Sequence, residues 1–157
     1  MIRCFDSGDI QNVNQNVDPI RDLEIIETEM MLADLESIQK RLEKNNKKNI
    51  DDKQITILQI ALDCINNEKD ISILKNQFSK KELNQSGLLS VKPKIFVCNV
   101  DEKSVQKGND YTKNFINKYG DDNTLIVSAD IENQINELDE NERKNYMEMI
   151  GLNETGL

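Results

Sequence analysis

The residues with the clearest potential for chemistry lie in the stretch KIFVCNVDEKS, Lys94–Ser104. An apolar run ends at Asn99 and is followed by Val100, Asp101 and Glu102. Open α/β sheets bind ligands beyond the carboxyl ends of their strands. An Asn amide at such a place offers both a donor and an acceptor to a purine edge. The pattern therefore predicts a loop that reads a purine base; the alternative is that Asn99 only caps the end of a strand.

The corresponding loop of GTP-binding proteins has the form Asn-Lys-x-Asp, in which the Asp accepts two hydrogen bonds from guanine and the Lys stem covers the base. Here Val100 stands at the Lys position, so we expect an aliphatic group to face the base. Glu102 stands at the Asp position and is longer, while Asp101 is expected to point to solvent. Losing a good hydrogen-bonding pair to a base costs about 1–3 kcal/mol. The tetrad therefore predicts that ATP is tolerated or preferred over GTP.

A second base-side element follows the next predicted strand, at Val127-Ser128-Ala129. GTP-binding folds place a Ser-Ala loop there, and its backbone N–H groups meet the base. The predicted nucleotide base-binding residues are Asn99, Val100, Glu102, Ser128 and Ala129. We predict no metal ligand, because the chain has no His and its three Cys form no CxxC pair. We also predict no catalytic residue, because the chain lacks a GxxxxGK[ST] phosphate-binding loop.

Composition narrows the class of protein further. The chain has 157 residues, a net charge of −9 and only 4% aromatic residues, with no Trp. This balance argues against a free-standing nucleic-acid binder, which needs a basic face. There is no apolar stretch of about 20 residues and no signal-peptide core at the N-terminus, so we expect a cytoplasmic protein without a membrane span. Cys4, Cys64 and Cys98 are expected to be buried thiols in a reducing compartment.

Two helices are predicted in the first half of the chain, from Pro19 to about Asn46 and after the polar run Asn45–Asp52. Their apolar residues follow the spacing of a coiled-coil seam. In the first helix these are Met31, Leu35, Ile38 and Leu42, extended by Leu23, Ile26 and Met30; in the second they are Ile55, Leu58, Leu62 and Ile65. Two helices of similar length with a short polar link predict an antiparallel hairpin.

The second half alternates strands and helices. Ser79 and Glu82 have the spacing of a capping box for a short helix. We then expect strands at Lys94–Asn99 and Thr124–Ser128, and helices at Asp110–Tyr119, Asp130–Leu138 and Glu140–Ile150. This order predicts an α/β fold with a partial parallel sheet, to which Met1–Phe5 adds a strand end. We expect a strand end and loop at 1–17, a helical coiled-coil insertion at 18–90 and an α/β part at 91–157.

With these residues in view, the chain resembles the YchF/Obg-like ATPase family, a branch of the Obg-type P-loop GTPases. The likeness covers nearly all of the chain, and its most specific pieces are IRCFDSGDI, VDPIRDLEIIETEMMLADLESIQKRLEK, KPKIFVCNVDE, SADIENQINELDENER and MIGLNETGL. The resemblance implies a G domain with a coiled-coil domain inserted before the base-reading strand. It also implies ATP or GTP as ligand, ATP hydrolysis linked to the Asn-x-x-Glu motif, Mg²⁺ in the intact family protein, and a link to ribosomes.

The chain departs from the family in its phosphate-binding parts. It contains no GxxxxGK[ST] and no DxxG motif, which the family carries before the point that matches Met1. The family also carries a TGS domain after the point that matches Leu157. We therefore expect an internal fragment, with the base-recognition loops and the coiled coil, that does not hydrolyse nucleotide alone.

Two alternatives stay open at this point. The hairpin could be a non-enzymatic interaction module that binds a ribosome-associated or other protein partner, with the α/β half as its support. Basic residues gather near its predicted tip, as a surface facing RNA or a partner or as a merely solvated loop; they are Arg41, Lys44, Lys47, Lys48 and Lys53. The chain could also be the product of a degraded gene.

Overall fold

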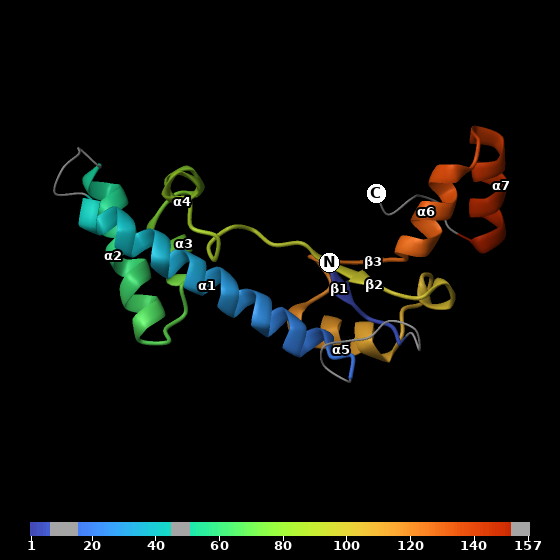
Figure 1. The fold of residues 1–157 in the computed structure, drawn as a ribbon, viewed down its shortest axis with the longest axis horizontal. Helices are drawn as coiled ribbons and strands as arrows, with labels where there is room; N and C mark the ends of the chain where they lie inside the picture. The colour runs from blue at the N-terminus through green and yellow to red at the C-terminus, as the bar shows by residue number, and fades with distance from the viewer. Residues whose placement is uncertain (7–15, 45–50, 152–157) are drawn as a thin grey trace. The chain divides into compact units, whose positions relative to one another are not determined.

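The chain forms two compact units in a computed structural model that describes residues 1–6, 16–44 and 51–151 (Figure 1). The first, here called the α/β unit, combines Met1–Leu23 with Lys94–Leu157. The second, here called the helical unit, is Glu24–Pro93. The α/β unit is thus assembled from two stretches far apart in the sequence, with the helical unit inserted between them.

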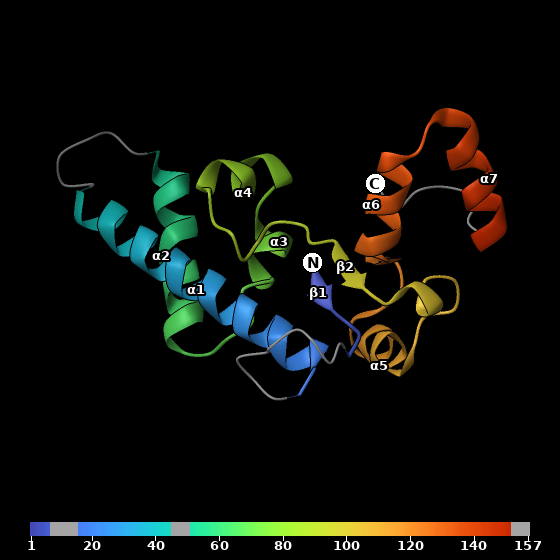
Figure 2. The same ribbon diagram turned by 45° about the vertical axis from the view of Figure 1, so that its right-hand side comes forward.

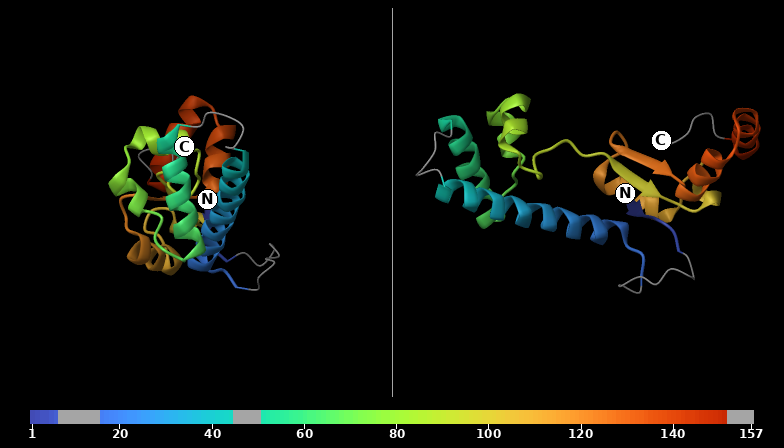
Figure 3. Two further views of the ribbon diagram at one scale, coloured as in Figure 1. Left: turned by 90° about the vertical axis from the view of Figure 1, so that its left-hand side faces the viewer. Right: turned by 45° about the horizontal axis from the view of Figure 1, so that its top comes forward.

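The α/β unit is built on a parallel sheet in the order β1-β2-β3. The strands are β1 (Ile2–Arg3), β2 (Phe96–Asn99) and β3 (Thr124–Val127). The arrows of β2 and β3 point the same way in the right-hand view of Figure 3. The described residues of this unit also form the helices α5 (Asp110–Tyr119), α6 (Ala129–Glu137) and α7 (Glu140–Ile150). The predicted α/β fold with a parallel sheet is confirmed.

One face of this sheet carries the core of the α/β unit. The parallel register aligns Ile2 with Cys98 and Cys98 with Ile126, which places all three side chains on one face. Phe115 of α5 packs there, with its ring centroid 5.5 Å from that of Phe96 and 4.8 Å from that of Tyr119. These edge-on and tilted contacts join three aromatic rings in this core, beside aliphatic side chains such as Ile2 and Leu23.

The opposite face of the sheet is only partly covered. Leu125 of β3 is 50% exposed and Ile95, just before β2, is 70% exposed. Val127 lies on the same face but is 4% exposed. The exposed apolar area therefore lies at the amino ends of β2 and β3. The loops that follow these strands begin at the opposite, carboxyl ends.

The helical unit contains most of α1 (Pro19–Lys44), then α2 (Asp52–Asn66), α3 (Ile73–Gln77) and α4 (Lys80–Ser86). Figure 2 shows α3 and α4 folding back beside α2. The prediction of two helices of similar length was wrong, since α1 has 26 residues and α2 has 15. The sequence after α2 forms further helices that pack on it, so α2 has more neighbours than a two-helix hairpin provides.

The core of the helical unit differs in register from the predicted seam. Ile38 and Leu58 are fully buried, as a seam requires, but Met31 is 36% exposed. The buried face of α2 consists of Gln54, Ile57, Leu58, Ala61 and Cys64. It is rotated by about one residue from the predicted seam because α3 and α4 also pack against α2.

Two sets of hydrogen bonds hold the short helix α4 and the segment that follows it. The predicted capping box is confirmed: the Ser79 hydroxyl accepts from the Glu82 N–H, and the Glu82 carboxylate accepts from the Ser79 N–H. Asp34 of α1, 2% exposed, accepts from the backbone N–H groups of Leu89 and Ser90, each at 2.8 Å. A buried carboxylate thus fixes the chain that follows α4.

The three cysteines are free and buried, as predicted. A hydrogen bond with Cys98, followed by burial, raises the pKa of the Cys4 thiol and keeps it protonated. Within the described ranges, no helix has the length and apolar character needed to cross a membrane.

Candidate functional site

The loops that follow β2 and β3 are joined directly to each other. The side-chain oxygen of Asn99 accepts a hydrogen bond from the Ala129 N–H at 2.9 Å, and the Val100 N–H donates to the Val127 carbonyl at 2.8 Å. The register explains this, because Asn99 pairs with Val127 and both strands end at the same edge. The structure thus brings Asn99, Ser128 and Ala129 together at the carboxyl edge of the sheet, where α/β folds bind ligands.

Asn99 links all three strands at this edge. Its carbonyl accepts from the Cys4 N–H at 2.8 Å while its side-chain oxygen holds Ala129. Among the described residues its side-chain NH₂ group has no hydrogen-bond partner, so a ligand can accept a hydrogen bond from it. The Ala129 N–H, by contrast, is already used, and a base must share it with Asn99.

The side chains of Val100 and Asp101 do not point in the directions that the sequence analysis predicted. Val100 is 1% exposed and packs in the core with Cys4, Cys98 and Phe115, because it continues the inward-facing alternation of β2. Its side chain therefore does not face a base in this structure. Asp101 is half-buried, and one of its carboxylate oxygens is enclosed without a hydrogen-bond partner in the described residues. The expectation that it points to solvent was wrong.

Glu102 is exposed and opens a single 3-10 turn, Glu102–Ser104. Its carboxylate accepts from the Gln134 side-chain amide of α6 at 2.7 Å. Gln134 in turn accepts from the Tyr146 hydroxyl of α7. Sequence reasoning missed Gln134 and Tyr146, since both lie on helices far downstream and no local motif marks them.

Ser128 is 1% exposed, and its hydroxyl has no hydrogen-bond partner within the described parts of the chain. A buried polar group without a partner costs about 1–3 kcal/mol, so such groups commonly mark functional positions. With the enclosed oxygen of Asp101 and the NH₂ group of Asn99, the two loops offer donors and acceptors without protein partners. The Asn99 NH₂ group can donate to the edge of a purine base, whereas the Ser128 hydroxyl and the Asp101 oxygen are closed off from a ligand in this structure.

A cavity of about 540 Å³ lies beside these loops, between the end of β1 and the start of α5. Its lining is polar and acidic, and consists of Phe5, Asp6, Asp101, Ser104, Asn109, Asp110 and Tyr111. Asn109 donates to the Cys4 carbonyl at 2.6 Å, and the Tyr111 hydroxyl donates to Asp6 at 2.8 Å, which raises the pKa of Tyr111. The three carboxylates favour a hydrogen-bond donor over a phosphate. No group of three or more His, Cys, Asp or Glu among the described residues could hold a metal ion.

The basic residues expected near the tip of the first two helices are partly engaged. Arg41 donates to the Ser86 carbonyl, and Lys53 pairs with Glu82 at 2.9 Å. Lys47 and Lys48 lie outside the described residues, and the side chain of Lys44 is not described either. Two of the five are therefore engaged inside the unit, which argues against a purely solvated or partner-facing role for them.

No protein-family model matches the sequence. Curated relatives do match over the full chain: the ribosome-binding ATPase YchF of Bacillus subtilis (strain 168) is 32% identical over 167 residues, covering 100% of this chain and 46% of that protein. The ribosome-binding ATPase YchF of Escherichia coli O157:H7 is 29% identical over 165 residues, with 100% and 45% coverage. The chain thus spans about half the length of the curated relatives it matches.

A solved structure with the same fold is that of the Schizosaccharomyces pombe YchF GTPase. It matches with a TM-score of 0.61 and 25% identity, over 96% of this chain and 44% of that one. The fold is a partial G-domain fold with a helical insertion, of the P-loop NTPase class. Within that class, the chain is similar over its whole length to proteins of the YchF/Obg-like ATPase family.

Proposed function

We propose that the loops after β2 and β3 form the purine-base half of a nucleotide site in a YchF-type protein. The observation that carries this proposal is the pair of bonds that joins the loops, Ala129 N–H to Asn99 and Val100 N–H to Val127. They fix Asn99, Glu102, Ser128 and Ala129 at one edge. The relatives are named an ATPase and a GTPase, which agrees with a purine nucleotide as ligand.

In this proposal each residue has a distinct role. The Asn99 amide donates to the base and positions the Ala129 N–H, while the backbone of Ser128 and Ala129 lies beside the base. Glu102 is the residue that discriminates between bases, and Val100 anchors its loop in the core. Glu102 is longer than the Asp of guanine-reading loops and is held by Gln134, so ATP should bind at least as well as GTP.

The chain's own residues supply base recognition and not phosphate chemistry. The phosphate-binding motif and Mg²⁺, which stabilise the transferring phosphoryl group, belong to the intact family protein. We therefore expect the 157-residue chain alone to show no ATPase or GTPase activity above a blank. Turnover that co-purifies with the chain through two orthogonal columns would contradict this expectation.

The direct test joins this chain to a family N-terminal segment that carries the phosphate-binding loop. ATP and GTP are titrated against the joined protein and against its Glu102→Asp variant by calorimetry. The unmodified protein should bind ATP at least as tightly as GTP, and Glu102→Asp should shift the ratio towards GTP by about tenfold. A strong GTP preference without the substitution would rule out the proposed role of Glu102.

A second function, compatible with the first, belongs to the helical unit. α1 exposes four large apolar side chains, Ile25, Ile26, Met31 and Leu32. Ile25 and Leu32, seven residues apart, lie on one face of the helix, and apolar side chains exposed on one face can form an interaction surface. The curated relatives are named ribosome-binding. We infer that α1 contacts a cytoplasmic ribosome or a ribosome-associated protein. Co-sedimentation with ribosomes should be lost in Ile25→Ser/Leu32→Ser and kept in the polar control Thr28→Ser/Glu29→Gln.

A further inference from the structure

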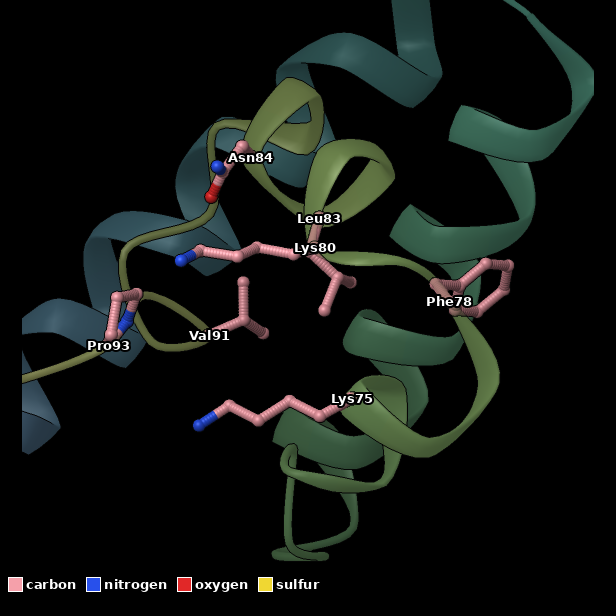
Figure 4. Close-up of a pocket in the computed structure, with 7 residues that line it drawn as sticks. All are labelled: Lys75, Phe78, Lys80, Leu83, Asn84, Val91 and Pro93. Atoms are coloured by element: carbon pink, nitrogen blue, oxygen red, sulfur yellow. The ribbon is translucent and has the colours of Figure 1, made fainter.

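The helical unit contains a cavity of about 340 Å³ that lies outside the nucleotide loops (Figure 4). It is enclosed by α3, α4 and the segment that follows α4. The lining residues are Lys75, Phe78, Lys80, Leu83, Asn84, Val91 and Pro93. Its volume is near the lower end of the range for ligand pockets, which are usually concave and largely apolar.

Two lysines cross the mouth of this cavity. Figure 4 shows the side chains of Lys75 and Lys80 running on either side of Val91 and ending on the same side of the hollow. Neither makes an ion pair among the described residues. By contrast, Lys40, Lys53 and Lys69 each pair with an acidic side chain at 2.7–2.9 Å. The cavity therefore combines an apolar floor with two positive charges that form no ion pair, although Lys75 helps to lower the pKa of the Asp70 carboxyl after its hydrogen bonds with Ser72.

The walls of the cavity are held in place by contacts that do not involve its lysines. The capping box of Ser79 and Glu82 fixes the start of α4, and the Gln54 amide of α2 donates to the Glu82 carbonyl at 3.1 Å. Asp34 fixes Leu89 and Ser90, and so the position of Val91. A preorganised site loses less entropy when a ligand binds.

We propose that this cavity binds an acidic peptide segment of a protein partner, with one apolar side chain on the floor and a neighbouring carboxylate between Lys75 and Lys80. The volume of about 340 Å³ has room for a large aliphatic side chain together with the peptide backbone on either side of it. Two ammonium groups match one carboxylate, and hydrogen bonds assisted by charge are stronger than neutral ones. The exposed Asn84 amide, which lines the same hollow, can bond a peptide backbone group.

Charge argues for a peptide over a nucleic acid. A nucleic acid requires a stripe of basic residues along its backbone, and this chain carries a net charge of −9. Two lysines beside an apolar floor neutralise a single acidic group instead.

The test follows the backbone amides of the labelled 157-residue chain by NMR while acetyl-Leu-Glu-Leu-amide is added. We expect shifts centred on Lys75, Lys80, Leu83 and Val91. Lys75→Glu/Lys80→Glu should weaken binding at least tenfold. The matched control Lys81→Glu/Lys92→Glu makes the same charge change at exposed lysines that do not line the cavity, and it should bind as the unmodified chain does. Acetyl-Leu-Lys-Leu-amide should not bind.

Each other outcome overturns the proposal. Shifts outside the cavity, or equal weakening in both double variants, would show nonspecific charge attraction. Equally tight binding of 4-methylpentanoate would assign the site to small organic acids. Binding of a single-stranded RNA oligomer at these amides, in place of the peptide, would assign it to nucleic acid.

Discussion

At the scale of single residues, the bond between Glu102 and Gln134 controls the proposed discrimination between bases. Gln134 holds the carboxylate of Glu102 and is itself held by Tyr146. In the joined protein, Gln134→Ala frees Glu102 to approach the donors of guanine. We expect the GTP-to-ATP affinity ratio to rise up to about tenfold, the worth of one hydrogen bond. Competition titrations measure it, with the exposed neighbour Asn133→Ala as control; equal ratios in both variants would contradict the role of Gln134.

Glu82 makes the helical unit sensitive to acid. The hydrogen bond from Lys53, followed by those from Ser79, lowers the pKa of Glu82 from its ordinary 4.5 to about 2. A depressed pKa contributes stability that is complete above 4.5 and is lost as pH falls through 2. Thermal melts followed by helical circular dichroism should therefore show a falling midpoint between pH 4.5 and 2. Glu82→Gln should flatten that slope; an unchanged slope would mean that other carboxylates cause it.

At the scale of elements, Asp34 connects α1 to the chain after α4. Asp34→Ala leaves two backbone N–H groups, of Leu89 and Ser90, without their acceptor. Each such loss costs about 1–3 kcal/mol, so urea unfolding should report a decrease of about 3 kcal/mol. Glu36→Ala removes an exposed acid from the same helix and should have no measurable effect. A similar small effect of both substitutions would show that the Asp34 contacts contribute little.

Local signals in the sequence predicted most elements well. The Ser79–Glu82 spacing, Gly120 after α5 and Gly151 after α7 mark helix ends, and the last two adopt positive φ angles of 89° and 69°. These features depend on residues close in sequence, so pattern analysis finds them. The buried face of α2 depends on α3 and α4, and the sequence of α2 alone does not reveal it.

The candidate site was predictable only in part for the same reason. Asn99, Ser128 and Ala129 follow strands, and parallel strands bring their ends to one edge. Val100 was misplaced because its burial depends on which face α5 covers. Gln134 and Tyr146 are linked to Glu102 by the packing of α6 and α7. The spacing of residues in the sequence does not indicate this packing.

At the scale of the whole molecule, the uncovered face of the sheet predicts self-association. Ile95 and Leu125 are exposed on the same face of the sheet, and burying such apolar surface is worth about 25 cal/mol per Å². Sedimentation velocity should detect oligomers of the chain that diminish in Ile95→Thr/Leu125→Thr. A monodisperse monomer with a sharp two-state melt would count against this expectation.

The central claim is that Asn99 organises a base-reading edge, and one measurement tests it most directly. ATP and GTP are titrated against the joined protein carrying Asn99→Ala, with Asn117→Ala on the exposed side of α5 as the matched control. Asn99→Ala removes both the donor to the base and the acceptor of the Ala129 N–H. The account predicts that both nucleotides bind at least tenfold more weakly while the control is unchanged. Unaltered affinity for both nucleotides in Asn99→Ala would contradict the account.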